Sequence, residues 1–387
     1  MTDFECAAST TWDAIVIGAG PAGSLAARQI ALGGARVLLV ERRAFPRWKV
    51  CGACLNGRGL AVLDAVGLGS LTAKLGAIPL ESFDLRHRGR AVRLPLPVGM
   101  ALSRASMDSE LSERARDAGV CVLNETQATV LPVLNSARRV ELTHNRVTVS
   151  IAAKVVVVAA GLGQQCIRDE PEVQTDAVLG SRMGAGCVVE DMPEGFEPGT
   201  LSMAVGRYGY VGLVRVEDGS LNVAAAFERD WLRTLGAPAA AAAAVLDEAG
   251  FSKVPGLQSA RWQGTAGLTR RARVAGSERL FLVGDAVGYV EPFTGEGMAW
   301  ALAAGLAVAP LALRAIERWN PALPKEWTET HQRLIASRQR ACRFVAGVLR
   351  RPLLVRVGFA VLANRPAFAR RFVRHLNAPP RLVDVHN

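Results

Sequence analysis

The sequence predicts an α/β fold, made of a parallel-sheet domain, a β-rich domain inserted into it and a C-terminal helical extension. Three observations predict this arrangement. An apolar strand, a glycine-rich turn, a helix and a second apolar strand follow one another over residues 12–41. Short alternating segments separated by turn signals occupy much of residues 173–230. Arginines are concentrated in residues 331–387, among apolar runs typical of helices.

Length and composition allow a large core and more than one domain. The chain has 387 residues, of which 50% are apolar and 21% charged, a balance typical of globular proteins. The formal net charge is +11. Residues 331–387 contain 12 arginines and one acidic residue, so this segment carries the whole excess. A protein that coats nucleic acid with a basic surface is therefore excluded, and we expect no nucleic-acid partner.

The cysteines and the first residues indicate a reducing compartment. The seven cysteines are odd in number and scattered. The acidic start, MTDFEC, lacks the basic and apolar regions of a secretory signal. We therefore expect a cytoplasmic protein, with the inner face of the membrane as a candidate peripheral location.

The first 41 residues contain a Rossmann-like βαβ unit. Gly18 permits the tight turn after the first strand, Gly20 lets the backbone approach a pyrophosphate, and Gly23 allows close packing of helix on strand. The helix runs to about Leu32 and its N-terminus supplies N–H groups to the phosphates. Glu41 ends the second strand, where its carboxylate can accept hydrogen bonds from a ribose diol. These pieces stand in the order that a dinucleotide site requires.

Three segments in the middle and late parts of the chain have clear patterns. Residues 155–160 predict a fully buried strand, and the alanine-rich residues 236–249 predict a helix. Residues 279–305 begin as a buried strand, pass through Gly284 and Asp285 and open a helix at about Met298. A carboxylate at the end of a buried strand suits a polyol hydroxyl, and a glycine-rich helix start can stabilise negative charge on a ring system. A second dinucleotide half-site is predicted there.

The uncharged run that begins at Gly297 resembles a membrane span in composition. It ends at Leu313, which makes it 17 residues long, and it contains Gly305 and Pro310. This is slightly short for a bilayer. We therefore expect a buried helix behind a cofactor.

In the order of its motifs, the sequence resembles the FAD-dependent aromatic hydroxylases (class A flavoprotein monooxygenases) and their relatives, the geranylgeranyl reductases. The resemblance covers roughly residues 12–315. It implies that FAD is bound, with NADPH or NADH as a candidate transient electron donor. The residues that it assigns to the cofactor are Gly18, Gly20, Pro21, Ala22, Gly23, Glu41, Arg42, Arg104, Val130, Gly161, Gly284, Asp285, Pro292, Gly295, Gly297 and Met298.

The resemblance also implies a role for several of these residues. The glycines of the first turn and Glu41 would bind the ADP half, and Asp285 the ribityl chain. Residues 292–298 would lie beside the isoalloxazine ring. Arg104 would begin a helix that borders the cofactor, and Val130 would lie where a strand meets the adenine.

The same resemblance predicts three domains. The FAD-binding domain would be discontinuous, the β-rich substrate domain would be inserted in it, and a basic helical extension would follow. The FAD-binding domain is assigned residues 1–80, 98–170 and 262–325, the substrate domain residues 81–97 and 171–261, and the extension residues 326–387.

Two segments resemble the reductases and one departs from the hydroxylases. Residues 45–52 (FPRWKVCG) resemble the PRxKxCG segment of the reductases, which places Cys51 near the flavin as a catalytic candidate. Tyr208 and Tyr210 match part of the reductases' aromatic substrate-cavity motif without its closing proline, and we expect both on one face of a strand. The hydroxylases' Asp-Gly pair is replaced by residues 159–161 (AAG), which argues against ordinary NADPH-driven hydroxylation.

Cys51 and Cys54 have the spacing of a redox dithiol or half a zinc site. No second cysteine pair has metal spacing, and the five histidines are dispersed, so zinc is not expected. A thiol beside the flavin with a buried second cysteine is favoured over a working dithiol. Whether the two form a disulfide stays open.

The resemblance leaves three functions. The first is a monooxygenase that hydroxylates an apolar-tailed aromatic substrate, phenolic or polyketide-type, through a flavin C4a-hydroperoxide. The second is a reductase of the geranylgeranyl reductase type that delivers hydride to a double bond of an isoprenoid or lipid. The third is a non-catalytic flavin-binding or membrane-docking protein. The sequence favours the monooxygenase, and either enzyme would take a lipophilic small molecule.

Residues 331–387 leave two arrangements open and predict no oligomeric state. Apolar runs mixed with arginines are typical of an amphipathic helix at a membrane surface. In that arrangement Leu353, Leu354, Phe359 and Phe372 would insert beside the arginines. The alternative is a cap on the FAD domain whose arginines are solvated.

Overall fold

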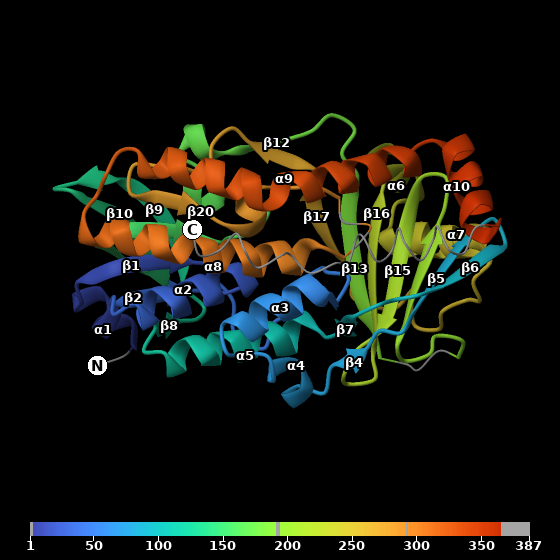
Figure 1. Ribbon diagram of the computed structural model, residues 1–387, viewed down its shortest axis with the longest axis horizontal. Coiled ribbons are helices and arrows are strands. Elements are labelled where there is room, and N and C mark those ends of the chain that lie inside the picture. The colour runs from blue at the N-terminus through green and yellow to red at the C-terminus, as the bar shows by residue number, and fades with distance from the viewer. Residues whose placement is uncertain (1–2, 191–193, 292, 294, 365–387) are drawn as a thin grey trace.

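The fold consists of two large sheets with helices packed on them, placed side by side along the long axis of the molecule (Figure 1). The computed structural model describes residues 3–190, 194–291, 293 and 295–364. Pro292 and the last part of the arginine-rich end, residues 365–387 with Phe372, lie outside the described residues. The expected α/β class, with a Rossmann-like domain and C-terminal helices, is confirmed.

The first sheet has the order β19-β20-β11-β1-β2-β8, and an antiparallel pair, β9 and β10, extends from β11. Its central strands β20, β11, β1, β2 and β8 run parallel, as the βαβ pattern requires. The strands are β1 (Trp12–Ile17), β2 (Val37–Val40), β8 (Cys121–Leu123), β9 (Gln127–Leu134), β10 (Ala137–His144), β11 (Val147–Val158), β19 (Gly276–Ser277) and β20 (Leu280–Leu282).

Helices pack on this sheet and on one another, and the apolar core of the domain lies between the helices and the sheet. They are α1 (Asp3–Ser9), α2 (Pro21–Leu32), α3 (Gly57–Ala65), α4 (Leu71–Lys74), α5 (Arg104–Asp117), α8 (Gly297–Glu317) and α9 (Leu323–Leu349). A Cβ on Gly305 of α8 would lie 2.4 Å from the carbonyl oxygen of Ala22 in α2. The two helix backbones therefore touch at Gly305, and a larger residue would separate them.

Helix α8 is the uncharged run that resembles a membrane span. By length and composition it is the one helix among the described residues that could cross a bilayer. However, 61% of its most apolar window is buried inside the protein, against α2, α3 and the sheet. The expected buried helix is what the structure contains, and Pro310 is accommodated within it.

The second sheet has the order β17-β13-β16-β15-β14-β5-β6 and is antiparallel except for the β14–β5 pair. Its strands are β5 (Ser82–His87), β6 (Arg90–Pro95), β13 (Met183–Val189), β14 (Thr200–Val205), β15 (Gly209–Arg215), β16 (Leu221–Phe227) and β17 (Gln263–Gly267). The sheet draws on both predicted substrate segments and runs on to Gly267, past the boundary predicted at residue 261. The domain boundaries stay predictions.

Alternation along these strands gives the second sheet two apolar faces. One face packs on α6 (Arg229–Leu235) and α7 (Pro238–Ala249). The other packs on the end of α9 and on α10 (Pro352–Asn364). We call the second packing region the β-face cluster. Its buried members are Leu85, Val92, Leu94, Met203, Val205, Tyr210, Ala226, Leu268, Leu349, Val355 and Phe359, with Phe83, Leu96, Leu162, Tyr289, Phe293, Val345 and Leu362 packed against them.

Two small sheets and three short 3₁₀ turns complete the fold between the large sheets. One small sheet joins β3 (Cys54–Asn56), β7 (Gly99–Ala101) and β4 (Ile78–Pro79). The other joins β12 (Thr175–Ala177), β18 (Arg270–Ala272) and β21 (Gly288–Tyr289). The 3₁₀ turns are η1 (Gln165–Ile167), η2 (Pro171–Val173) and η3 (Gly284–Ala286). One residue separates the end of β20 from the start of η3.

His331 of α9 makes the stability of the fold depend on pH. Its ring is 6% exposed and lies edge-on to Trp327, with centroids 5.7 Å apart. Burial lowers the pKa of His331 from 6.5 to about 4. Only the unfolded chain binds the proton in this range, so the free energy of unfolding falls as the pH drops from 6.5 towards 4.

We expect the wild type to lose about 2 kcal/mol more stability than His331→Leu when the pH is lowered from about 7 to 5. Urea unfolding of both proteins at the two pH values measures this difference. An equal loss in the two proteins would mean that His331 does not bind its proton preferentially in the unfolded chain.

Candidate cofactor site

The turn between β1 and α2 can be formed only by glycine at two positions. Gly18 has a φ of +103°, and a Cβ there would lie 2.6 Å from the carbonyl oxygen of Ala159. A Cβ on Gly23 would lie 1.8 Å from the carbonyl oxygen of Gly18. Glycine is therefore required at both positions by close packing. At Gly18 the turn packs on the end of β11, and at Gly23 the helix α2 packs on the turn.

Gly20 differs from these two glycines, because the space next to it is bordered by charged side chains and not by backbone atoms. A Cβ on Gly20 would meet the guanidinium of Arg104 at 3.3 Å and that of Arg47 at 3.9 Å. Gly20 precedes Pro21 at the start of α2, and no side chain caps this helix start. An anion that approached Gly20 would meet both guanidinium groups and the N-terminus of α2, which suits a pyrophosphate.

The two guanidinium groups are held in place by buried carboxylates. Arg104 donates two hydrogen bonds to Asp108, at 2.8 and 2.7 Å. Arg47 forms ion pairs with Asp108 and with Glu41, each at 3.0 Å. All four side chains are less than 10% exposed. Sequence reasoning missed Arg47 and Asp108, although the spacing of Arg104 and Asp108, four residues apart on a predicted helix, was a signal.

Glu41 lies at the end of β2, directly beside the glycine turn. Its carboxylate accepts hydrogen bonds from the backbone N–H of Ala19 at 3.1 Å and of Arg43 at 3.2 Å. These bonds fix a buried negative charge next to the start of α2, where a ribose diol could donate to it. Arg42, the next residue, is exposed, and its charge acts on Cys166.

Asp285 and Lys49 are two further buried charged groups of the site, and their charges interact. Burial raises the pKa of Asp285, while the charges of Lys49 and Arg104 oppose this rise. Burial lowers the pKa of Lys49, which lies close to Gly161: a Cβ there would be 2.7 Å from its Nζ. Gly284 packs on Ala22 of α2, so the second half-site adjoins the first. Lys49 was not predicted as a site residue.

Removing the Asp285 carboxylate is expected to weaken FAD binding. The group would form a charge-assisted hydrogen bond with the ribityl chain, worth ~1.5–3 kcal/mol, so Asp285→Ala should raise the Kd for FAD roughly 10- to 100-fold. Asp285→Asn keeps the shape without the charge and should show a smaller rise. Fluorescence titration of the protein stripped of flavin measures each Kd, and an unchanged value for the alanine variant would contradict the ribityl assignment.

The glycine-rich segment before α8 is lined by a thiol and a phenol. Gly295 has a φ of +70°, and a Cβ there would lie 3.5 Å from the Cβ of Cys54. A Cβ on Gly297 would lie 3.2 Å from the hydroxyl oxygen of Tyr289. Met298 points instead into the core between α3, α5 and α8, so only its backbone can face a cofactor.

Glu296 places a buried acid in the same segment. Its side chain is 1% exposed, and burial raises its pKa to about 7, although Asn56 and Trp300 act to lower it. The carboxyl group therefore exchanges its proton near neutral pH. The position of Glu296 between two glycines predicted to line the site was the available signal, but no sequence pattern indicated that its side chain is buried.

Cys51 and Cys54 are free thiols on the cofactor side of the protein. The Cys54 thiol donates to the carbonyl oxygen of Gly52 at 3.0 Å, and burial raises the pKa of this thiol to about 12. Cys51 lies close enough to Tyr289 and Arg104 to interact electrostatically with both. The backbone carbonyl of Cys51 accepts a hydrogen bond from Asn222 of β16, at 2.8 Å, which ties this segment to the second sheet.

Val130 lies in the core of the first domain. Its side chain is fully buried in β9, among residues of β10, β11 and β8. The residues just before β9 lie nearer to the predicted ADP site. There the backbone N–H of Thr126 donates to the carbonyl oxygen of Glu41 at 3.0 Å. Any contact of this stretch with an adenine is thus easier to form near Thr126 than through the Val130 side chain.

The two tyrosines expected on one face of a strand lie in different environments, and that expectation is wrong. Tyr208 lies in a bend before β15 and stacks on Trp231 of α6, with ring centroids 5.5 Å apart. Tyr210 lies in β15 and meets Phe293 edge-on at 5.1 Å in the β-face cluster. The alternation rule fails because Tyr208 is outside the strand.

Tyr210 belongs to a buried polar network that the sequence analysis missed. Arg182 and Glu291 form an ion pair at 2.9 Å, and their side chains are 1% and 0% exposed. Arg350 approaches Glu291 from α9 at 3.4 Å. Burial and the neighbouring Glu291 raise the pKa of Tyr210. The network joins β13, β15 and α9 beside the segment that leads to Gly295.

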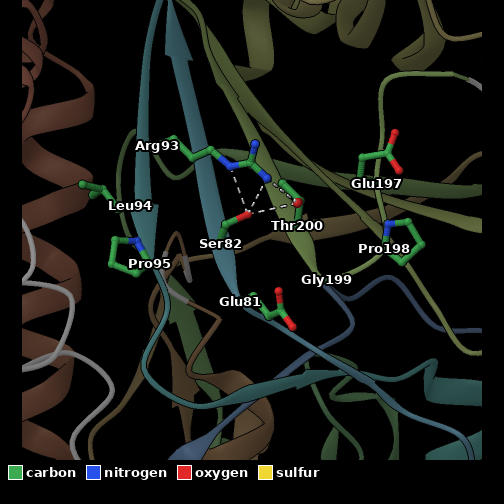
Figure 2. A pocket seen from close by; sticks show the side chains of 9 residues that line it. All are labelled: Glu81, Ser82, Arg93, Leu94, Pro95, Glu197, Pro198, Gly199 and Thr200. Carbon is green, nitrogen blue, oxygen red and sulfur yellow. Dashed lines mark hydrogen bonds between the residues drawn. The ribbon is translucent and has the colours of Figure 1, made fainter.

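A hollow of about 470 Å³ lies elsewhere, on β5, β6 and β14 (Figure 2). Arg93 donates to the hydroxyls of Ser82 and Thr200, which also bond to each other at 3.0 Å. The side chains of Ser82, Arg93 and Thr200 thus hydrogen-bond to one another. None of the residues predicted to bind the cofactor lines it.

The donor set of the glycine-turn site fits the parts of FAD. The space beside Gly20, with the guanidinium groups of Arg47 and Arg104, suits the pyrophosphate. The Glu41 carboxylate suits a ribose, and Asp285 with Lys49 suits the polyol chain. The segment around Gly295 and Gly297 suits a ring system.

Comparison with known proteins agrees with this fit. The FAD binding domain family matches residues 11–163. Menaquinone reductase of Mycobacterium tuberculosis is 30% identical over 342 residues, which cover 80% of this chain and 79% of that protein. Digeranylgeranylglycerophospholipid reductase of Thermoplasma acidophilum is 26% identical, with 79% of each chain covered. The structure of p-nitrophenol 4-monooxygenase from Pseudomonas putida DLL-E4 shares the fold at a TM-score of 0.75, with 16% identity and coverage of 94% and 97%.

Proposed function

Because the chain belongs to the family of FAD-binding flavoproteins that contains the menaquinone reductase of Mycobacterium tuberculosis, we propose that it reduces a carbon–carbon double bond in a prenyl-chained lipid. It is an FAD-dependent oxidoreductase, and FAD, when bound and reduced, supplies the hydride. Menaquinone and digeranylgeranylglycerophospholipids both carry prenyl chains, so one substrate class fits the names of both relatives. The alternative that sequence analysis placed second is thereby preferred to the monooxygenase.

The observation that carries the proposal is the group of proton-bearing side chains beside the segment of Gly295 and Gly297. A hydride delivered to one alkene carbon must be matched by a proton delivered to the other. Burial raises the pKa of Tyr289, which keeps its hydroxyl protonated, and the Cys51 thiol is near enough to interact with it electrostatically. We assign Cys51 as the proton donor and Tyr289 as the group that positions it.

We place the lipid chain at the β-face cluster, which supports the proposal by its apolar composition. Phe293 and Tyr289 pack against it from the cofactor side, and Phe359 of α10 closes it from the other. An apolar chain lying between these rings would contact apolar side chains that otherwise contact one another. Its binding would not require any polar group to lose its contact with water. Its double bond would then approach the ring segment from the second sheet.

Anaerobic mixing tests the proposal. Enzyme reduced with dithionite and freed from excess reductant should return to the oxidised flavin spectrum when a menaquinone with an unsaturated chain is added. A menaquinone with a saturated chain and the same ring controls for reduction of the quinone itself. Equal flavin oxidation by both would assign the electrons to the ring and contradict chain reduction.

Hydroxylation of an apolar-tailed aromatic compound is the second candidate, and Tyr210 favours it. The Tyr210 hydroxyl and the buried Glu291 offer a phenol a polar partner that an alkene does not need. Substrate-stimulated oxygen consumption by reduced enzyme with candidate phenols would support this function. Loss of this oxygen consumption in the Tyr210→Phe variant would indicate that the phenol binds at Tyr210. Absence of turnover with lipid and phenol alike would leave a flavin-binding protein without catalysis.

A further inference from the structure

The outer surface of α10 is apolar and has no partner in the described part of the chain. Leu353, Leu354, Val357 and Val361 are 73%, 40%, 60% and 39% exposed. Their spacing places all four within roughly 100° of the helix circumference. Val355 and Phe359, each 5% exposed, occupy the opposite side and pack in the β-face cluster. Helix α10 therefore has two apolar faces, one buried and one open.

Exposed arginines border the open face. Arg351 and Arg356 belong to α10 or adjoin it, and Arg340 is exposed on α9. Phe344 of α9 is also 70% exposed. No acidic residue occurs between residues 330 and 364, so α10 itself carries no carboxylate beside Arg351 and Arg356. Figure 1 shows α10 at one end of the long axis, beside β5 and β6.

We propose that α10 lies flat on an anionic bilayer, with this open face inserted at the boundary between headgroups and acyl chains. Apolar side chains flanked by arginines match both layers of such a surface. We do not propose a span across the bilayer, because the 13 described residues of α10 are fewer than a span needs and include Arg356. A second copy of the chain fits less well, because face-to-face packing would bring like-charged arginines together.

The structure changes the insertion expected from the sequence in one respect. Phe359 points into the β-face cluster and cannot insert, whereas Val357 and Val361 are exposed on the open face. Helix α10 then separates the bilayer from the cluster proposed above as the site of the lipid chain. Docking itself does not depend on that proposed function. If both hold, a lipid chain reaches the cluster past α10 without crossing water.

Flotation of the full, FAD-loaded chain on vesicles tests the docking. Vesicles of one part phosphatidylglycerol to two parts phosphatidylcholine should carry the wild type at low salt, and binding should fall steeply as salt is raised. The double variant Leu353→Glu/Val357→Glu should bind at least tenfold less. Arg351→Gln/Arg356→Gln should bind less at low salt and lose part of the salt dependence. Vesicles of phosphatidylcholine alone should bind the wild type weakly.

Val147→Glu is the matched control, because Val147 is 56% exposed at the β10–β11 hairpin and should not alter flotation. Flavin content and thermal unfolding show that each variant is folded. Three results would overturn the docking: no flotation of the wild type, flotation of the α10 glutamate variant equal to that of the wild type, or self-association that this variant abolishes while neither protein floats. Equal flotation would assign membrane binding to another part of the chain.

Discussion

Gly20→Val is expected to give folded protein that lacks FAD. The reason is that valine at Gly20 fills the space where the pyrophosphate approaches the backbone, while the protein itself can accommodate the change. The nearest protein atom to its Cβ is the end of the Arg104 side chain at 3.3 Å, which needs only a small shift. We expect near-complete loss of the flavin absorbance of the purified protein, with circular dichroism unchanged.

Two other glycines give the matched controls for this experiment. Gly264→Val, on the edge strand β17, meets only one backbone atom, at 4.0 Å, and should keep its FAD. Gly23→Val would place its Cβ 1.8 Å from the Gly18 carbonyl oxygen and should not fold normally. Full flavin content in Gly20→Val would contradict the position assigned to the phosphates.

Cys51→Ser is expected to remove most of the turnover with a prenyl-chained lipid while FAD binding stays intact. A serine hydroxyl is a far weaker acid than a thiol, so the proton needed at the second alkene carbon arrives slowly. Loss of a general acid typically costs ~10²–10⁴-fold in rate. Steady-state turnover and the pH profile of kcat measure the effect, because a merely structural role would leave the shape of that profile unchanged.

Cys6→Ser controls for the loss of a thiol as such, since Cys6 is exposed on α1. Its turnover should equal that of the wild type. Near-normal turnover of Cys51→Ser would contradict the thiol as proton donor. If that turnover also consumed oxygen, hydroxylation would be favoured, because oxygen transfer from a flavin needs no protein thiol.

The parts of the site that could be predicted from sequence are those formed by neighbours in the chain. The turn containing Gly18 and Gly23, the helix after it and Glu41 at the end of the next strand follow from one continuous pattern. Asp285 follows in the same way from a buried strand that ends in a glycine. In each case the local pattern alone determines the backbone and the direction of the side chain.

The parts that could not be predicted depend on pairs distant in sequence. Arg182 and Glu291 are 109 residues apart, and neither stands in a recognisable motif. Lys49 reaches Asp285 only because the segment after β2 folds back across the domain. Tyr208 was misplaced for another reason: the strand begins at Gly209, which leaves Tyr208 in a bend, where alternation does not apply.

The fate of oxygen and hydrogen in the product distinguishes the two enzyme functions most directly. The measurement is the mass of a menaquinone with an unsaturated chain after incubation with reduced, FAD-loaded enzyme under nitrogen, followed by exposure to air. Air returns a quinol to the quinone, so only a change in the chain persists. We predict a stable gain of two hydrogen atoms in the prenyl chain, formed without oxygen. A product that has gained one oxygen atom, and forms only when oxygen is present during the reaction, would contradict the reductase.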